Sequence, residues 1–447
     1  MFRFRFRDEK NRYELTELAK MFVPAEELDC FAEDGDFFVI PGPDEMDRNA
    51  QKRVLYGYMS EKTGRELKWG TLTGVRPLKL FNKLVRQTGS ADTAAEALKT
   101  DYLVSDDKAD LLRKVWNTQS VLTFDRSPRA VGLYIGIPFC PTRCLYCSFT
   151  SNKYSRDKAD AYLNALEKEI DAVSRMFSEK GLYAESLYIG GGTPSSLEED
   201  QFRRLTDKTA ASLLSPKTAE FTVECGRPDS ITECKLKALL AAGCGRISIN
   251  PQSMQQRTLE RIGRAHGPED IVRAFSLAKD AGVKIVNADL IAGLPGETPP
   301  DMADSLRRIM DLEPQNITVH TLAVKRGSRL IEQDKDLSYS GGDAVYEMLA
   351  QSYGTLGNAG YSPYYLYRQK HMTGNMENTG WSLSGCESIY NLRIMEEDQS
   401  IIALGAGGVS KLYYPEEDRV ERVANVSNYE IYIDRIDEMI KRKEDAL

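Results

Sequence analysis

The sequence lacks long hydrophobic runs, and none of its apolar stretches approaches the roughly 18 residues that a membrane helix needs. It also lacks a basic excess, because 59 Lys and Arg residues stand against 67 Asp and Glu residues, for a net charge of −8. Proteins that neutralise many phosphates are normally basic, so this balance argues against nucleic acid as the main partner. The first residues, MFRFRFRDEK, lack the apolar core of a signal peptide. We therefore expect a cytoplasmic protein without a membrane span.

What the chain does have is an ordinary globular composition, with 41% hydrophobic and 28% charged residues over 447 positions. This length predicts two or three domains, and the composition excludes disorder for most of the chain. The eight cysteines are expected to be reduced, because disulfides are rare in proteins that are not secreted. A metal or redox role for them is therefore considered before a disulfide framework.

Short apolar segments alternate with helical patterns through the middle of the chain. The predicted strands are 131–137, 185–189, 220–223, 246–249, 284–288 and 316–321. Buried strands that alternate with helices indicate βαβ units and a parallel sheet. Six such units in series can curl into an open barrel or lie as a doubly wound sheet.

The predicted fold class is α/β, and three parts of the chain differ in pattern. Residues 1–125 do not share the strand–helix rhythm and are predicted to form a small α/β domain that begins with a half-buried strand, MFRFRFR. Residues 126–330 hold the six units. Residues 331–447 are predicted to form a C-terminal α/β extension with a tyrosine-rich strand, a glycine-rich turn and a charged terminal helix.

Three cysteines crowd together directly after the first predicted strand. Cys140, Cys144 and Cys147 lie in the segment IPFCPTRCLYCSF with the spacing CxxxCxxC. Thiolates hold iron–sulfur clusters, and three of them on one loop suggest a cluster in which one iron keeps a free coordination position. A structural zinc site would want a fourth ligand, and no His or Cys lies near Cys147 in the sequence. Buried inert thiols are the other alternative.

Further polar or glycine signals follow each of the later strands. They are GGGTP after the second strand, Glu224 after the third, Gln252 after the fourth, Asp289 after the fifth and Ala323 after the sixth. In parallel barrels the carboxyl ends of the strands carry the active site, so we expect these residues to lie around one site. Taken singly, each signal is also explained by a tight turn, a helix cap or a salt bridge at the rim of the barrel.

These segments, together with NPQS at 250–253 and DLIAGLPGET at 289–298, resemble the radical SAM enzymes. More closely, they resemble the oxygen-independent coproporphyrinogen III oxidases over residues 133–323. The segment WGTLTGVRP at 69–77 is similar to the branch of that family found in Gram-positive bacteria. The resemblance implies a partial (β/α)6 barrel of the TIM type.

The resemblance also implies the cofactors and their ligands. A 4Fe–4S cluster would sit on Cys140, Cys144 and Cys147 and bind S-adenosylmethionine, of which the chain would hold one or two molecules. The residues implied to contact the first molecule are Tyr134, Gly191, Gly192, Thr193, Glu224 and Ala323. Those implied to contact the second are Gln252, Arg264 and Asp289. The expected partners are a tetrapyrrole substrate and a reductant such as flavodoxin or ferredoxin.

The activity implied is the conversion of coproporphyrinogen III to protoporphyrinogen IX in haem synthesis, by a 5′-deoxyadenosyl radical and without oxygen. Close relatives often carry a fourth cysteine two positions after the third, where this chain has Phe149. Relatives proposed to handle haem share that departure. A haem-delivery protein, or another radical reaction on a tetrapyrrole, is therefore kept as an alternative.

No catalytic residue of the chain itself is assigned from the sequence. His320 lies in the sixth predicted strand, where a hydrogen-bonded core histidine is the commoner role. Four tyrosines of the C-terminal part could stack on a flat macrocycle or form an ordinary aromatic strand: Tyr361, Tyr364, Tyr365 and Tyr367. Five basic residues are candidates to bind substrate carboxylates: Lys325, Arg326, Arg329, Arg368 and Lys370.

Overall fold

The computed structural model describes residues 1–31, 36–147, 151–323, 330, 341–370 and 372–447. In its middle part, strands alternate with helices as the sequence predicts. The elements are β4 (Ala130–Ile137), β5 (Phe139–Cys140), β6 (Asn152–Lys153), α6 (Arg156–Lys180), β7 (Tyr183–Gly191), α7 (Glu199–Leu213), β8 (Glu220–Glu224), α8 (Glu233–Ala241), β9 (Arg246–Gln252), α9 (Gln256–Arg261), α10 (Pro268–Ala281), β10 (Ile285–Ala292), α11 (Pro299–Met310) and β11 (Asn316–Thr321). Helices α6 and α10 end at Gly181 and Gly282, whose φ angles of +65° and +89° suit glycine.

The parts before and after this region complete the secondary structure. The N-terminal elements are β1 (Phe2–Phe6), α1 (Arg12–Ala19), β2 (Leu28–Asp29), β3 (Phe38–Ile40), α2 (Arg48–Thr63), α3 (Pro77–Thr88), α4 (Ala91–Tyr102) and α5 (Asp106–Ser120). The C-terminal elements are α13 (Gly342–Asn358), β12 (Ser362–Arg368), β13 (Glu377–Ser382), α14 (Ile389–Glu396), β14 (Ile401–Leu404), β15 (Val409–Tyr414), β16 (Arg419–Ala424), α15 (Tyr429–Asp434) and α16 (Ile436–Ala446). In the described part of the chain, no helix is both long and apolar enough to cross a membrane.

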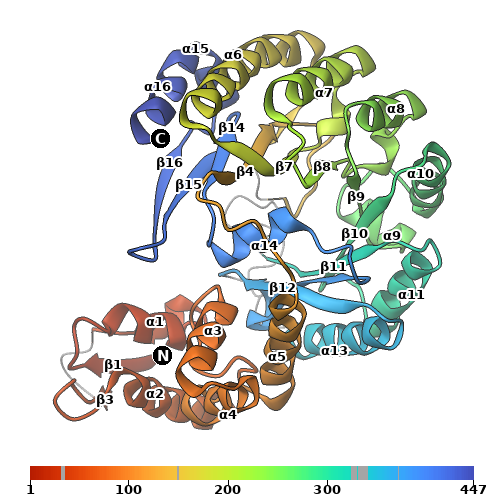
Figure 1. Ribbon diagram of the computed structural model, residues 1–447. Helices are drawn as coiled ribbons and strands as arrows, with labels where there is room; N and C mark the ends of the chain where they lie inside the picture. Colours follow the sequence, from red (N-terminus) through yellow and green to blue (C-terminus); the bar gives the residue numbers. More distant parts are fainter. Residues whose placement is uncertain (32–35, 148–150, 324–329, 331–340, 371) are drawn as a thin grey trace.

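One curved sheet of 11 strands organises the molecule, in the order β12-β13-β11-β10-β9-β8-β7-β4-β14-β15-β16. The strands from β4 to β11 are parallel, and helices α6, α7, α8, α10 and α11 cover only the outer face of the curve (Figure 1). This arrangement confirms the partial barrel and excludes a doubly wound sheet, whose helices would cover both faces.

The C-terminal strands join both edges of the barrel sheet. Strand β13 pairs antiparallel with β11 at one edge, and β14 pairs parallel with β4 at the other. The tyrosine-rich strand predicted near 361–367 is β12, which pairs with β13. The domain limits expected at 125/126 and 330/331 stay a prediction.

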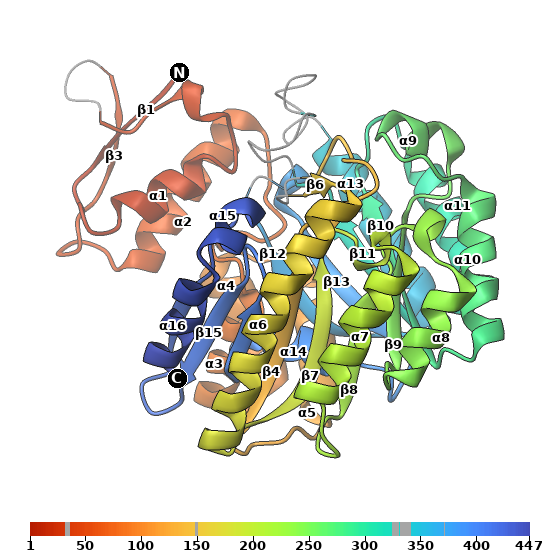
Figure 2. The ribbon, with the colours of Figure 1, turned by 90° about the horizontal axis from the view of Figure 1, so that it is seen from above.

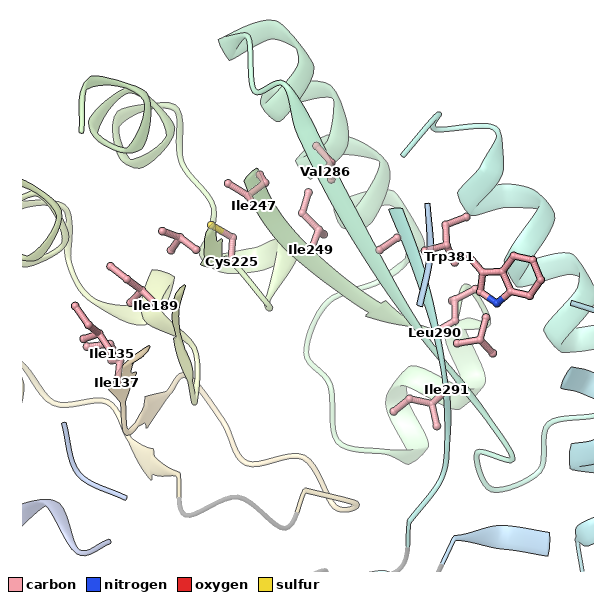
Figure 3. Close-up of a cluster of buried hydrophobic side chains, with 14 of the residues drawn as sticks. Ile135, Ile137, Ile189, Cys225, Ile247, Ile249, Val286, Leu290, Ile291 and Trp381 are labelled. Carbon is pink, nitrogen blue, oxygen red and sulfur yellow. The ribbon is translucent and has the colours of Figure 1, made fainter. Parts of the chain in front are cut away.

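Alternation along the barrel strands gives each strand an apolar face and a polar face. Ile135, Ile137 and Ile189 belong to the layer of buried side chains that Figure 3 shows, which continues through β9 and β10. Side chains that alternate with these point the other way, and among them Tyr134 and Tyr188 line a cavity inside the curve. Because side chains alternate at a period of two, one face forms the core under the helices and the other forms the interior of the barrel.

Helix α14 lies inside the curve of the open barrel (Figure 1). Its first turn donates backbone N–H groups of Ile389 and Tyr390 to the carboxylate of Glu220, at 2.9 and 3.1 Å. Arg393 forms a buried ion pair with Glu185 at 3.0 Å. Both acids lie near the start of a barrel strand, so the end opposite the expected site is fixed by buried charges.

The N-terminal residues build a second, smaller core. Phe4, Leu15 and Phe22 are buried in a cluster of their own, away from the main core. Figure 2 shows this unit, with β1 and α1, standing out from the barrel. Helices α3, α4 and α5 belong instead to the main core, and α5 packs on β12.

Candidate functional site

A cavity of about 460 Å³ opens at the carboxyl ends of the barrel strands, and we call it the main cavity. Every residue that the sequence implies as a ligand of the cluster or of S-adenosylmethionine lines it. These residues are Tyr134, Cys140, Cys144, Cys147, Gly191, Gly192, Thr193, Glu224, Gln252, Arg264, Asp289 and Ala323. They come from segments spread over some 190 positions of sequence, and parallel strand ends bring them to one place.

The cysteine segment forms one wall of the main cavity. Its backbone is tied to the barrel by the amide of Leu145, which donates to the carbonyl of Ile262 at 3.0 Å. Arg227 donates to the hydroxyl of Thr142 at 2.8 Å. The three thiols therefore belong to a loop that is anchored from two directions.

The thiol of Cys140 lies beside the glycine segment. Burial raises its pKa, and the hydroxyl of Thr193 donates to its sulfur at 3.4 Å. A thiol must lose its proton to bind a metal, so cluster assembly has to release this proton. Within the described ranges no three Cys, His or acidic side chains are arranged to hold a single ion. The fit to a larger group rests on the cavity that the three thiols share and on their thiolate chemistry.

The glycine segment packs against the cysteine strand. The amide of Gly192 donates to the carbonyl of Ile137 at 2.8 Å, and the amide of Thr193 donates to that of Phe139 at 2.7 Å. A Cβ atom on Gly192 would lie 2.5 Å from the Phe139 carbonyl oxygen and 3.0 Å from the Cys140 sulfur. This close approach accounts for Gly192 without a ligand. Gly191, with φ of +110°, exposes its backbone to the cavity.

Glu224 closes strand β8 beside the glycine segment. Its carboxylate accepts from the hydroxyl of Tyr188 at 2.7 Å and from the amide of Gly191 at 3.3 Å. Burial raises the pKa of Glu224 from 4.5 to about 7, and nearby Asp289 adds to the rise against these two hydrogen bonds. The free protein therefore holds a carboxyl group poised between its two protonation states near neutral pH.

The pKa of Glu224 gives a prediction about stability. Because the folded protein holds this proton more tightly than the unfolded chain does, the free energy of unfolding contributed by Glu224 falls as pH rises from about 4.5 towards 7. Glu224→Gln keeps the side chain at position 224 uncharged at every pH. We expect it to stabilise the protein by on the order of 1–2 kcal/mol at about pH 8 and by almost nothing at about pH 5. Urea unfolding at both pH values measures the difference. The exposed Glu416→Gln is the control, and an equal gain at both pH values would contradict the assignment.

The residues expected to bind a second nucleotide line the same cavity. Gln252 has a φ of +69°, and its buried Oε1 atom has no hydrogen-bond partner among the described residues. Arg264 donates to the Asn250 carbonyl at 2.5 Å and to the hydroxyl of Tyr146 at 3.0 Å. An unpartnered buried acceptor costs free energy, so Gln252 has the features of a group that awaits a donor.

Asp289 lies within β10, not after its end as expected, because the strand continues to Ala292, and it faces His320 of the neighbouring strand β11. The two side chains are 3.6 Å apart between Nε2 and Oδ2, and Asn287 donates to the other carboxylate oxygen at 2.7 Å. Asn287 also donates to Ser248 at 2.9 Å. This polar band crosses the barrel interior from β9 to β11.

Sequence reasoning missed several residues that line the main cavity. Tyr188 pairs in register with Tyr134, and the same alternation that points Tyr134 inward could have identified it. Arg227 follows Glu224 by three positions, within a departure from the family pattern. Tyr390 stacks on Tyr188 with ring centroids 4.6 Å apart. It belongs to α14, and no local signal in the sequence places that helix inside the barrel.

The remaining candidates divide between the cavity and other roles. Tyr365, Tyr367 and His320 line the main cavity. Tyr361 instead donates to the Pro314 carbonyl, and Tyr364 packs against α14. Arg368 donates to backbone carbonyls, including that of Leu72 at 2.6 Å, and Lys370 pairs with Glu17 at 2.6 Å. Lys325, Arg326, Arg329 and Phe149 lie outside the described residues.

The family model of the radical SAM superfamily matches residues 134–309, which run from β4 into α11. The chain therefore contains a radical SAM domain, as its motifs predicted. This domain implies a 4Fe–4S cluster and S-adenosylmethionine as cofactors.

Individual relatives show to which family within the superfamily the chain belongs. The oxygen-independent coproporphyrinogen-III oxidase-like protein HemZ of Bacillus subtilis (strain 168) is 38% identical over 413 residues, covering 90% of this chain and 82% of the relative. Within the superfamily, the chain belongs to this family of oxidase-like proteins. The heme chaperone HemW of the same organism is 36% identical over 193 residues, covering 43% of this chain and 50% of HemW.

A solved structure shows the same fold. Coproporphyrinogen III oxidase HemN from Escherichia coli, described as a radical SAM enzyme, superposes with a TM-score of 0.57 at 24% identity. The match covers 70% of this chain and 71% of HemN.

Proposed function

We propose that the chain is a radical SAM enzyme that oxidatively decarboxylates two propionate groups of coproporphyrinogen III without oxygen. The observation that carries the proposal is the main cavity, in which the three thiols, the glycine segment and Glu224 line one space. That space lies within the range of small-molecule sites, about 300–1,000 Å³. The family membership reported above supports the same reaction class.

Each group of residues has a part in this proposal. Cys140, Cys144 and Cys147 would hold the cluster, while the exposed backbone of Gly191 and the carboxylate of Glu224 would bind the nucleotide. Once bound, these cofactors supply the one-electron, hydrogen-abstracting chemistry of the superfamily. The chain itself positions the nucleotide against the substrate and keeps water away from the reacting carbon.

The substrate side of the main cavity is aromatic. Tyr365 and Tyr367, both on β12, have parallel rings with centroids 6.4 Å apart, and Tyr390 stacks on Tyr188. Aromatic rings of this kind offer flat apolar surface to a tetrapyrrole. Each of the two propionates that react would lose a β-hydrogen atom, carbon dioxide and one electron, and its two remaining carbons would become a vinyl group.

An anaerobic turnover assay tests the proposal. We expect the cluster-loaded protein, reduced flavodoxin, S-adenosylmethionine, coproporphyrinogen III and a one-electron acceptor to give carbon dioxide, 5′-deoxyadenosine and protoporphyrinogen IX. Two carbon dioxide molecules should form for each protoporphyrinogen. Formation of 5′-deoxyadenosine without decarboxylated product would instead indicate another radical reaction.

A second candidate is haem binding, and two observations favour it. One relative is a heme chaperone, and this chain has Phe149 where oxidases often have a fourth cysteine. A haem carrier would bind haem stoichiometrically and transfer it without turnover. Haem titration followed by transfer to an apo-haemoprotein separates the two candidates, because an oxidase should show no such transfer.

A further inference from the structure

A second cavity of about 510 Å³ adjoins the main cavity, and we call it the basic annex. It has an apolar wall and cationic groups, and its lining includes Val75, Arg76, Tyr367, Ile394, Met395 and Lys411. Tyr367, Ile394 and Met395 line the main cavity as well, so one layer of side chains borders both spaces. A ligand in the main cavity can therefore reach into the annex beside these residues.

Positive charge exceeds negative charge around the basic annex. Glu397 is 7% exposed, and its carboxylate is contacted by four cations: Arg76, Lys79, Lys411 and Arg422. Of the four, only Arg76 and Lys411 line the annex. Burial lowers the pKa of Lys411, and the neighbouring Arg76 lowers it further. Glu396 is a second carboxylate within electrostatic reach of Arg76 and Lys79, so two acids face four cations here, and an anion entering the annex would be attracted.

The segment LTGVRP places Arg76 at the annex. Arg368 fixes the turn before it, because its amide donates to the Val75 carbonyl at 2.7 Å and its guanidinium donates to that of Leu72 at 2.6 Å. Arg76 precedes Pro77, the first residue of α3, and its backbone is held outside the helical region, with φ of −126° and ψ of 75°. The radical chemistry of the barrel does not explain the LTGVRP segment. Its role is then to place Arg76 at the annex.

We propose that the basic annex binds carboxylates of a tetrapyrrole whose ring lies in the main cavity, and that Arg76 and Lys411 hold them. This inference rests on the proposed function for the identity of the ligand. A flat apolar ring with flexible carboxylate arms matches an apolar wall beside two partly buried cations. Charge-assisted hydrogen bonds from these side chains would fix which propionate faces the reacting centre and which are held away from it.

Equilibrium binding to the cluster-loaded protein tests the inference. We expect coproporphyrin III, followed by fluorescence quenching, to bind more tightly than its uncharged tetramethyl ester. Arg76→Met and Lys411→Met should each weaken binding of the acid about tenfold and leave the ester unchanged. Arg76→Lys keeps the positive charge, so its affinity for the acid should fall less than that of Arg76→Met. Melting temperatures verify that each variant is folded.

Arg422→Met is the matched control, because Arg422 contacts the same Glu397 oxygen at 3.3 Å as Lys411 does at 3.1 Å, but does not line the annex. It should bind the acid as the unaltered protein does. The inference is overturned if Arg76→Met and Lys411→Met bind the acid normally, or if their affinities for acid and ester fall equally. It is also overturned if the affinity of Arg422→Met for the acid falls to the same extent, because the effect would then arise from Glu397.

Turnover measured in parallel separates this inference from the proposed function. If the unaltered protein forms protoporphyrinogen IX and Arg76→Met has the same KM for coproporphyrinogen III as the unaltered protein, the inference fails and the function stands. If binding depends on Arg76 but no product forms, the function fails and the annex remains a carboxylate site. If the unaltered protein neither binds nor converts the porphyrin, both fail.

Discussion

Replacing Cys144 by alanine is expected to abolish formation of 5′-deoxyadenosine, with a loss on the order of 10³-fold or more. The reason is that the variant removes one of three thiols on the wall of the main cavity, and Cys140 and Cys147 alone cannot complete the set. Iron and acid-labile sulfide should fall together with activity. The measurement is anaerobic, with chemical reconstitution, dithionite as reductant and chromatographic quantification of the nucleoside.

Cys234→Ala provides the control for this result. Cys234 lies on α8, is partly exposed and does not line the main cavity. It should keep full iron content and full activity after the same reconstitution. If Cys144→Ala retained both, the three-cysteine set would be wrong and the cluster would have to use other ligands. Because Cys144 is not deeply buried, its replacement should leave the melting temperature almost unchanged, which distinguishes lost chemistry from unfolding.

Much of the barrel and its site could be predicted because both depend on local patterns. A buried strand such as 131–137 is visible as an apolar run, and its end predicts where a polar residue will face the site. The rule that parallel strands end at one rim was enough to gather Cys140, Glu224 and Asp289 around one cavity. The distances within the cavity then follow from strand spacing and register rather than from any further sequence signal.

The rest could not be predicted because it depends on pairing across long sequence separations. Strand β14 pairs Ile401 with Gly132, and nothing in either segment specifies the other. Tyr390 reaches the main cavity because Glu220, at the start of β8, binds the first turn of α14. The basic annex likewise joins Arg76 to Lys411, which are 335 positions apart. Arg368, a candidate from the sequence for binding substrate carboxylates, also lines the annex and in addition fixes the turn before Arg76.

Adding one methyl group at Gly192 is expected to lower the rate of S-adenosylmethionine cleavage by at least about 100-fold, the scale of a 1 Å misplacement in a catalytic site. The Cβ atom of Gly192→Ala would meet the Phe139 carbonyl oxygen at 2.5 Å, and backbone on both sides cannot yield easily. Moving apart would break the hydrogen bonds from Gly192 to Ile137 and from Thr193 to Phe139, and would displace the Cys140 sulfur.

Two measurements test the Gly192 prediction. Equilibrium dialysis of S-adenosylmethionine with the reconstituted protein should show weakened binding, and anaerobic single-turnover assays should show the loss of rate. Gly57→Ala is the matched control, because Gly57 lies in helix α2 with no atom within 4 Å of its added Cβ. That variant should bind normally and gain roughly 0.5–1 kcal/mol of stability from helix propensity. Normal binding and rate in Gly192→Ala would show that the glycine segment can shift without disturbing the nucleotide site, and would remove it from the proposed binding set.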